Sequence, residues 1–274
     1  MNQSQMWNST GGQAWVMSQS LLDHMYKPFE DVLVDAVSLT SPRHVLDVGC
    51  GTGATTVAIA RRLDPSGSCV GIDISQPMIA AARARAEEDG VTASFICADA
   101  ETYAFDAASI DMIVSRFGVM FFNDPIRAFA NLRGAAADGA PLRCIVWRSP
   151  AENPFMTAAE QAAEPLLPGV SKRVPNEPGQ FGFADHDHVR RILTASGWRG
   201  IDIAPIDVDC VFPASELEFY VGTLGPVGRS LQSADDDTRA RVMQATLPAF
   251  DPYRRGDEIR FSAACWLVDA RAGA

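Results

Sequence analysis

The chain has 274 residues, of which 47% are hydrophobic and 21% charged, so it holds enough apolar material for a sizeable core and is not a disordered chain. Thirty-four acidic residues against 23 basic ones give a formal net charge of −11, and the chain as a whole does not attract phosphate backbones or anionic lipid. We therefore expect neither a general nucleic-acid binder nor a membrane-surface binder.

The cysteine spacing and the first residues bear on the cellular compartment. The six cysteines lie too far apart for metal-finger spacing, and five fall in apolar stretches that read as strands, where we expect small, packed side chains in a reducing compartment. The six are Cys50, Cys69, Cys97, Cys144, Cys210 and Cys265. No basic start is followed by an apolar run, and no apolar run reaches the roughly 18 residues of a membrane span. These features predict a soluble cytoplasmic protein without a metal site.

Between residues 43 and 148, short β-branched runs alternate with longer segments of helical period. The alternation is typical of parallel strands joined by crossover helices, so an α/β fold is predicted. The expected strands span residues 43–49, 68–75, 93–99, 110–117 and 140–148. The expected helices span 53–63, 76–90 and 124–136, the last with Asp124 as its cap and Pro125 at its first position.

Six prolines between residues 150 and 183 break this rhythm, which predicts a loop-rich cover over the sheet. The segments that follow are expected as a helix (185–198), a strand (200–212), a mainly helical insertion (214–250) and a last strand (258–272). The acidic run 235–237 reads as a solvated helix start rather than a metal site, because carboxylates oppose the positive end of a helix dipole.

The sharpest motif is VLDVGCGTGATT, residues 45–56, in which an expected strand runs into a glycine-rich turn before a helix begins. Gly49, Gly51 and Gly53 permit positive φ and close approach of the backbone to a ligand. Twenty residues after Gly53, Asp73 ends the next expected strand, where a carboxylate can accept both hydroxyl hydrogens of a ribose. The combination indicates a nucleoside ligand; the alternative is a tight turn followed by a helix-capping acid.

The spacing of the glycines separates two kinds of nucleoside ligand. A dinucleotide fingerprint reads G-x-G-x-x-G and presents amides to a pyrophosphate, whereas this loop reads G-x-G-x-G. Asp47 precedes the loop, and a carboxylate there is a poor neighbour for pyrophosphate but a good one for an ammonium group. A ligand with a cationic end near Asp47 is therefore favoured.

The segments VLDVGCGTG, GIDIS, CADAETYAF and FDAASIDMIVSRFGVMFF together resemble the successive motifs of the class I S-adenosylmethionine-dependent methyltransferases. The resemblance is to the UbiE/Coq5-like (methyltransferase type 11) branch and covers roughly residues 43–148. It implies a Rossmann-like, seven-stranded, mostly parallel sheet with helices on both faces, an N-terminal helical cap and inserted cover segments. The run 258–272 lies where the family has its antiparallel last strand.

The resemblance implies S-adenosylmethionine as the cofactor and assigns residues to its methionine end. Asp47 would hold the amino group, and the backbone of Gly49 and Gly51 would face the methionine part. The backbone from Ser115 to Phe117 would close over the same end.

The ribose and the adenine are assigned in the same way. Asp73 would take the ribose hydroxyls, with Ile74 and Met78 packed beside the adenine. Asp99 and Ala100 would meet the adenine amino group and ring nitrogen. Met78 is alternatively a plain core residue, and Asp99 alternatively caps a turn.

Aromatic residues follow the fourth and fifth expected strands and recur in the cover, so they are expected to converge above the carboxyl ends of the strands. They are Phe117, Phe121, Phe122, Trp147, Phe155, Phe181 and Phe183. This set favours an apolar methyl acceptor of aromatic or polyketide-like character; the alternative is that the rings only pack the cover onto the sheet. Trp7 and Trp15 precede an amphipathic helix, a placement that in similar proteins lets the segment cap the cofactor; the alternative is that they only pack in the core.

Histidines are the natural general bases near neutral pH, and the chain has four. His44 lies at the wrong end of the sheet. His24 is on the cap helix and could face either the cleft or solvent, and His186 and His188 favour a surface role. Transfer to an activated ring carbon or to an ionised phenolate needs no strong base. No catalytic residue is assigned.

The sequence thus predicts a small-molecule methyltransferase in one domain over 1–274, with an N-terminal cap (1–40), a cofactor-binding core (41–150) and a substrate cover with the remaining strands (151–274). The alternative is a partner or regulatory subunit that binds the cofactor without methyl transfer. A nicotinamide oxidoreductase is disfavoured by the glycine spacing, and nucleic-acid methylation by the charge and by the segment SRFGVMF. The acceptor atom is not fixed, and a homodimer is compatible with the sequence.

Overall fold

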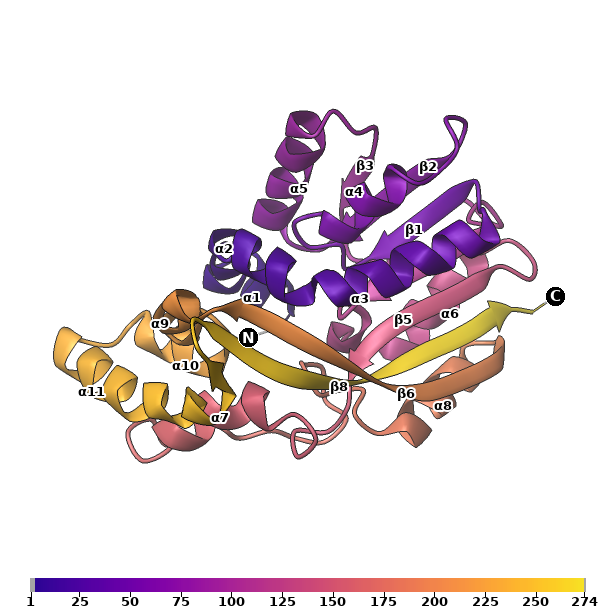
Figure 1. Cartoon of the computed structure of the whole chain (residues 1–274). Helices are drawn as coiled ribbons and strands as arrows, with labels where there is room; N and C mark the ends of the chain where they lie inside the picture. The colour runs from indigo at the N-terminus through magenta and orange to yellow at the C-terminus, as the bar shows by residue number, and fades with distance from the viewer. Residues whose placement is uncertain (1–2, 274) are drawn as a thin grey trace.

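The computed structural model describes residues 3–273 and shows a twisted sheet with helices packed on both faces (Figure 1). The strands run in the order β3-β2-β1-β4-β5-β8-β6, and the two-residue β7 pairs with β8 beside this path. They are β1 (His44–Val48), β2 (Ser68–Asp73), β3 (Ser94–Cys97), β4 (Met112–Arg116), β5 (Pro141–Trp147), β6 (Trp198–Pro213), β7 (Arg254–Arg255) and β8 (Glu258–Ala272). The predicted Rossmann-like sheet is confirmed, and β7 is an extra short strand that was not predicted.

The parallel part of the sheet creates the place for a ligand. β1 pairs in parallel with both β2 and β4, so the chain first builds outward to β3 and then crosses back to β4. Ligands of open α/β sheets bind at such a reversal, beyond the carboxyl ends of the strands. β8 is antiparallel to β5 and to β6, as predicted for the last strand.

The helices within the described residues follow the expected order. They are α1 (Gln3–Trp7), α2 (Thr10–Met17), α3 (Gln19–Thr40), α4 (Ala54–Ala60), α5 (Gln76–Glu88), α6 (Pro125–Ala135), α7 (Pro154–Ala163), α8 (His186–Ala195), α9 (Leu217–Thr223), α10 (Gly225–Leu231) and α11 (Asp236–Thr246). Short 3-10 helices are η1 (Val119–Phe121), η2 (Ala214–Glu216) and η3 (Leu247–Tyr253). None of the helices in residues 3–273 is both long and apolar enough to pass through a bilayer.

Helix starts agree with the capping residues. Asp124 accepts a hydrogen bond from the amide of Arg127 at 3.0 Å at the start of α6. Asp235 accepts one from the amide of Thr238 at 2.7 Å at the start of α11, so the acidic run does begin a helix. Helix α7 departs from the predicted loop, because Pro154 occupies its first turn, where no amide donor is needed.

Two long strands connect the sheet to the cover. β5 ends where Trp147 pairs with Cys265, but β6 and β8 remain paired as far as Pro213 and Glu258. The resulting ribbon extends beyond β5 and carries η2, α9, α10, α11 and η3, which lie beside α7 (Figure 1). The predicted helical insertion is thus placed over the carboxyl ends of β4 and β5.

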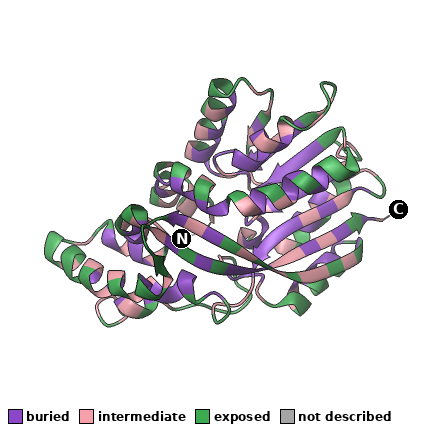
Figure 2. Ribbon diagram, in the orientation of Figure 1, coloured by how far each residue is buried: buried purple, intermediate pink, exposed green. Residues whose placement is uncertain are grey.

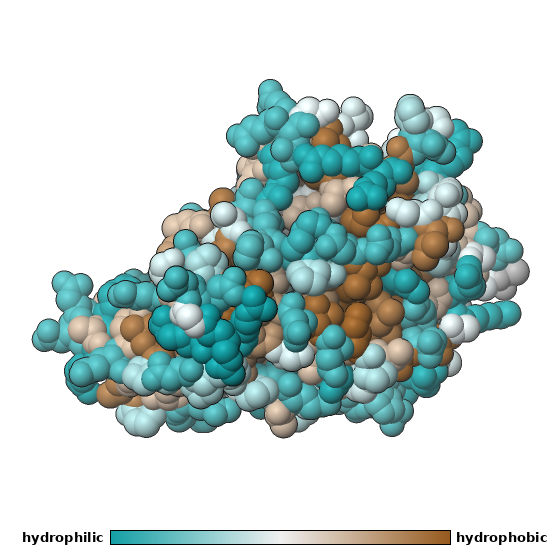
Figure 3. Space-filling view, in the orientation of Figure 1, coloured by the Kyte–Doolittle hydropathy of each residue, from teal (hydrophilic) through white to brown (hydrophobic). Residues whose placement is uncertain are grey.

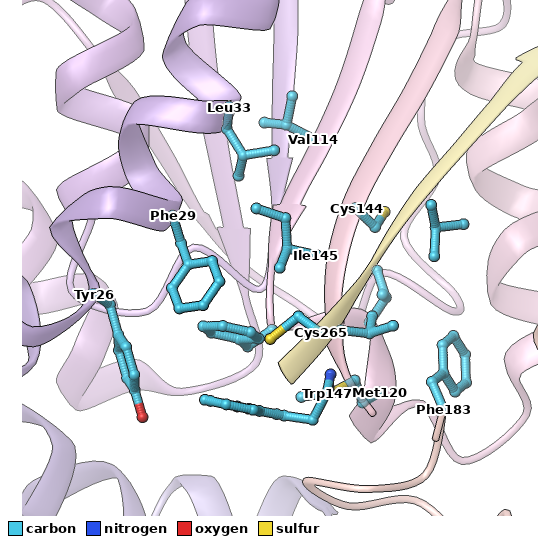
Figure 4. Packing of buried hydrophobic residues seen from close by; sticks show 14 of the residues in the cluster. Tyr26, Phe29, Leu33, Val114, Met120, Cys144, Ile145, Trp147, Phe183 and Cys265 are labelled. Atoms are coloured by element: carbon cyan, nitrogen blue, oxygen red, sulfur yellow. Dashed lines mark hydrogen bonds between the residues drawn. The ribbon is translucent and has the colours of Figure 1, made fainter. Parts of the chain in front are cut away.

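Helix α3 covers one face of the sheet because its apolar residues recur at helical spacing. Phe29 and Leu33 are fully buried and point toward Val114 and Ile145 on β4 and β5 (Figure 4). Buried residues concentrate on the central strands and on the inner sides of the helices (Figure 2). On the face shown in Figure 3, hydrophobic side chains gather over the strands below α3, and hydrophilic ones dominate the helical insertion.

The cysteines that were predicted to pack as small hydrophobic residues do so in four cases. These are Cys69, Cys144, Cys210 and Cys265, all buried. For Cys97 the prediction was wrong: it is exposed, because it is the last residue of the edge strand β3. Cys50, in the glycine loop, is buried.

Candidate active site

The loop between β1 and α4 has the backbone that its glycines permit. Gly49, Gly51 and Gly53 have φ values of 67°, 56° and 82°. A Cβ on Gly49 would lie 2.5 Å from the Cα of Gly118, so this position excludes a side chain. At Gly51 a Cβ would lie 3.8 Å from Met78 Sδ and from Trp15 Nε1, within the wall of a cavity. The predicted positive φ values of the three glycines are confirmed.

Asp73 joins this loop to the end of β2. One carboxylate oxygen accepts a hydrogen bond from the Gly51 amide at 2.9 Å, and the other accepts one from the Ser75 amide at 2.8 Å. The side chain is buried, and burial raises the pKa of Asp73 against these amide hydrogen bonds. The acid that the sequence places after the second strand therefore lies beside the glycine loop.

Asp47 lies at the base of the same cavity and is 1% exposed. Its carboxylate accepts a hydrogen bond from Thr56 Oγ1 at 2.6 Å. Burial raises the pKa of Asp47 to about 6, although Thr56 and the Arg116 guanidinium oppose the rise. A cation placed beside Asp47 would favour its ionised form.

Arg116 is a site residue that the sequence reasoning missed. It ends β4, lines the cavity, and donates a hydrogen bond to the Tyr26 carbonyl oxygen at 3.2 Å. The available signal was position: β4 is the parallel neighbour of β1, so a cation at its carboxyl end must lie near Asp47. Asp47 and Arg116 together present one carboxylate and one guanidinium.

The loops after β3 and β4 are held together on the other side of the cavity. Asp99 accepts a hydrogen bond from the Glu101 amide at 2.9 Å, and Glu101 in turn accepts one from the Asp124 amide at 3.1 Å. The Asn131 side-chain amide donates to the Ala100 carbonyl oxygen at 2.9 Å. These bonds fix Asp99 and Ala100 in the cavity wall.

One cavity of about 440 Å³ brings the predicted residues together. Nine of the ten line it: Asp47, Gly49, Gly51, Asp73, Ile74, Met78, Asp99, Ala100 and Phe117. The tenth, Ser115, does not line it but is fully buried between the two loops. Its hydroxyl donates to the Val48 carbonyl oxygen at 2.7 Å and accepts from the Gly118 amide at 3.1 Å.

Phe117 marks strain at the edge of the site. Its φ is 65°, a region that costs a bulky residue free energy and is found at functional sites. Its ring stacks on that of Trp147, with centroids 4.6 Å apart and planes 11° from parallel. Tyr26 packs edge-on against Phe117, and its hydroxyl points away from the apolar cluster (Figure 4).

The predicted aromatic set is only partly in the cavity. Phe117, Phe121, Phe122, Trp147 and Phe155 line it, whereas Phe181 and Phe183 do not. Phe181 lies under the Arg173 guanidinium, and Phe183 stacks on Phe129. Three lining rings were missed, because they come from α3 and from the insertion: Tyr26, Tyr220 and Phe250.

The N-terminal helices close the cavity over the glycine loop. Trp7 and Trp15 line it, and Trp7 packs edge-on against Phe121 with centroids 5.2 Å apart. The Ser75 hydroxyl donates to the Trp7 carbonyl oxygen at 2.6 Å. The Asn8 side chain donates to the Ile74 carbonyl oxygen and accepts from the Gln76 amide, both at 2.9 Å.

None of the four histidines, all of which lie in the described part of the chain, lines the cavity. His24, the candidate on the cap helix, lies on the exposed side of α3 and does not line the cavity. His186 packs edge-on against Trp266 and pairs with Asp187, and burial lowers the pKa of His188. The site is therefore built without a histidine.

The described residues fit the cofactor that the motif order implies. The buried Thr55 hydroxyl lies in the cavity wall and has no hydrogen-bond partner among residues 3–273. Gly51 leaves open the space that a side chain would fill. Acidic, basic and apolar groups thus line one cavity. A ligand that joins an amino acid to a nucleoside requires all three kinds of group.

Known proteins share these features. A family model described as a methyltransferase domain matches residues 45–139. A nocamycin O-methyltransferase of Saccharothrix syringae is 38% identical over 228 residues, which cover 79% of this chain and 81% of that protein. A demethylmenaquinone methyltransferase of Renibacterium salmoninarum is 25% identical over 178 residues, covering 62% of this chain and 72% of that protein. The relation to quinone methyltransferases is thus confirmed as a distant one.

The fold is shared with a solved structure, that of the YcgJ protein of Bacillus subtilis. The TM-score is 0.56 at 17% sequence identity, and the match covers 88% of this chain and 98% of that one. The chain therefore belongs to the class I S-adenosylmethionine-dependent methyltransferases and is an enzyme that uses S-adenosylmethionine as its methyl donor.

Proposed function

We propose that the enzyme methylates a small, apolar or aromatic acceptor that enters the cavity from the cover side. The observation that carries this proposal is the continuity of the cavity, which runs from the glycine loop past Phe117 and Trp147 to Phe155 and Phe250. Aromatic walls contribute a large apolar contact area and suit flat acceptors. The names of the nocamycin and demethylmenaquinone relatives fit a natural-product or quinone acceptor.

The cofactor roles are assigned on geometry and on the family motifs. Asp73 takes the ribose hydroxyls, while Ile74 and Met78 flank the adenine, whose edge meets Asp99 and Ala100. These residues surround the half of the cavity that lies over β2 and β3.

At the methionine end, Asp47 pairs with the ammonium group and Arg116 with the carboxylate. The backbone of Gly49, Gly51 and Phe117 forms the wall there, and Ser115 acts by holding that wall in place.

When bound, S-adenosylmethionine supplies a methyl group on a positively charged sulfur, which an acceptor takes by direct displacement. The chain's own contribution is to align the acceptor and to exclude water, through the rings of Tyr26, Phe117 and Trp147 and through the N-terminal helices. Burial raises the pKa values of Tyr26 and Tyr220, so both phenols stay protonated at neutral pH. The Tyr220 hydroxyl donates to Met156 Sδ at 3.7 Å, which leaves Tyr26 as the hydrogen-bond donor to the acceptor. An acceptor that ionises easily, or an activated carbon, fits a site without a histidine base.

The test combines binding with product detection. Calorimetry should show micromolar binding of S-adenosylmethionine and S-adenosylhomocysteine and none of NAD. An acceptor screen with naphthoquinols and polyketide-like phenols, read by mass spectrometry, should yield a product heavier by one methylene group. Preference for small polar amines would overturn the acceptor class, and cofactor binding without product from any acceptor class would favour the non-methylating alternative.

A further inference from the structure

The cover end of the cavity is positively charged, although the chain carries a net charge of −11. Lys172, Arg173 and Arg229 line this end together with a single acid, Glu160. Glu160 is 2% exposed and forms an ion pair with Arg173. One carboxylate therefore faces three cations, and the Glu160–Arg173 pair leaves the charges of Lys172 and Arg229 unbalanced.

Arg229, on α10, has open hydrogen-bond donors. Within residues 3–273 its guanidinium has no carboxylate within 4.0 Å and no hydrogen-bond acceptor. Its side chain remains accessible and lines the cavity, while surrounding protein lowers the pKa of Arg229 and Glu160 raises it. A guanidinium carries five N–H donors in a planar fork, and those of Arg229 are open to solvent and to any molecule that enters the cavity. An anion in the cavity can therefore bind them without displacing a protein partner.

The cations come from other segments of the chain than the cofactor loop. Lys172 and Arg173 follow α7 and Arg229 lies on α10, whereas Asp47 and Arg116 lie on β1 and β4, and all five line the same cavity. An acceptor bound in this cavity is therefore in reach of cations that the cofactor loop does not supply.

We propose that Arg229, assisted by Arg173, binds a carboxylate that the methyl acceptor carries at a position remote from the methylated atom. This inference rests on the proposed function and adds a substrate class to it: a flat, apolar molecule with one anionic end. A guanidinium recognises a carboxylate through paired N–H donors. Glu160 neutralises part of the charge of Arg173, and the aromatic rings of the cover contact the acceptor's apolar body.

The experiment uses anthraquinone-2-carboxylate and anthraquinone-2-carboxamide, which share a ring system and differ in charge. Calorimetry on protein saturated with S-adenosylhomocysteine measures the affinity of each probe. The unchanged enzyme should bind the carboxylate about tenfold to a hundredfold more tightly. Arg229→Met should abolish this preference and leave carboxamide binding unchanged. Arg241→Met, an exposed position on α11 outside the cavity, is the matched control and should change neither affinity.

A second variant has the opposite expected sign. Glu160→Gln keeps the shape of the side chain but removes the carboxylate that neutralises Arg173 and repels an anion. It should bind anthraquinone-2-carboxylate several-fold more tightly, with the carboxamide unaffected. A purely structural Glu160–Arg173 network predicts unchanged or weaker carboxylate binding instead.

The outcomes separate this inference from the proposed function. Saturation with S-adenosylhomocysteine is established first, and its failure would count against the proposed cofactor site. With the cofactor product bound, equal affinity for the two probes, no measurable carboxylate binding, or equal losses for both probes in Arg229→Met would each overturn the carboxylate site alone.

Discussion

The Gly51 amide donates a hydrogen bond of 2.9 Å to a carboxylate oxygen of Asp73 across the gap between β1 and β2. The second oxygen is engaged by the Ser75 amide, so Asp73 shapes the glycine loop before any ligand arrives. Each carboxylate oxygen can still accept a further hydrogen bond, which leaves lone pairs for the two hydroxyls of a ribose. One side chain thus serves both the loop and the proposed ligand contact.

Removal of Asp73 should weaken cofactor binding strongly. Asp73→Ala loses charged hydrogen-bond acceptors and leaves the Gly51 amide without its partner, at a cost of about 1.5–3 kcal/mol, or about tenfold to a hundredfold in affinity. Asp73→Asn keeps one oxygen for Gly51 and should lose less. Calorimetry with S-adenosylhomocysteine measures the effect. The exposed Asp64→Asn is the control, and equal affinity in all the proteins would contradict the ribose role.

Asp47 predicts a pH dependence with a definite sign. Because burial raises the pKa of Asp47 to about 6, the carboxyl is protonated below pH 6 and must lose its proton to pair with an ammonium group. Affinity for S-adenosylhomocysteine should therefore rise with pH, by at most about tenfold per unit below pH 6, and level off above it. Asp47→Asn should bind weakly and without this dependence. Isothermal titrations from pH 5 to pH 7.5 decide, and a flat profile for the unchanged enzyme would refute the assignment.

The same raised pKa acts on the free protein in the other direction. The folded chain holds the Asp47 proton more tightly than the unfolded chain does, so this group's contribution to stability falls as pH rises from about 4 to 6. Thermal unfolding of the ligand-free enzyme and of Asp47→Asn should differ more at pH 7 than at pH 4, with the variant relatively more stable at the higher pH.

Arg116 should recognise only the methionine part of the cofactor. Arg116→Met removes the guanidinium beside Asp47, and we expect a loss of about tenfold or more in affinity for S-adenosylhomocysteine. Adenosine has no carboxylate, so its affinity should stay the same. Arg127→Met, at an exposed position on α6, is the control. Equal losses for both ligands would mean that Arg116 acts only by holding Tyr26 on α3.

The grouping of residues around the glycine loop was predictable because its information is local. The order of strand, glycine turn and helix fixes Gly49 and Gly51, and the acid at the end of the next strand must lie beside them once both strands are parallel neighbours. The position of Asp73 follows from chain order alone. Arg116 follows from the same logic applied to β4, but an arginine has no spacing signature of its own.

The acceptor half depends on contacts between distant segments. Tyr220, Phe250 and Arg229 reach the cavity only because β6 and β8 stay paired beyond β5, a register that no local pattern encodes. His24 shows the converse case: its residue type suits a general base, but it lies on the exposed side of α3. A catalytic role inferred from residue type also requires that the side chain points into the cavity. In this protein the direction of the side chain is set by tertiary packing.

The N-terminal helices should control release of the cofactor. Asn8 joins the segment between α1 and α2 to the loop after β2 by two hydrogen bonds of 2.9 Å, and Trp7 and Trp15 lie in the cavity wall behind it. Asn8→Ala should raise the dissociation rate of S-adenosylhomocysteine by about threefold to tenfold. The N-terminal helices of the variant can move away from the loop after β2 without breaking the two Asn8 hydrogen bonds. Stopped-flow tryptophan fluorescence reads the rate. Gln244→Ala, exposed on α11, is the control, and an unchanged rate would mean that the helices do not gate release.

Two glycine-to-alanine substitutions should have opposite effects on stability. A Cβ at Gly118 would lie 2.5 Å from the Val48 carbonyl oxygen and 2.7 Å from the Gly49 Cα, so the glycine loop and the end of β4 would have to separate. Gly118→Ala should therefore lower both the unfolding temperature and the affinity for S-adenosylhomocysteine.

At Gly134, near the end of α6, a Cβ meets nothing within 4 Å. There, alanine should stabilise the protein by up to about 1 kcal/mol through helix propensity and leave binding unchanged. Calorimetric unfolding of both variants compares the two effects. Full affinity in Gly118→Ala would show that the loop tolerates displacement and that close contact between the two glycines is not required for the cofactor site.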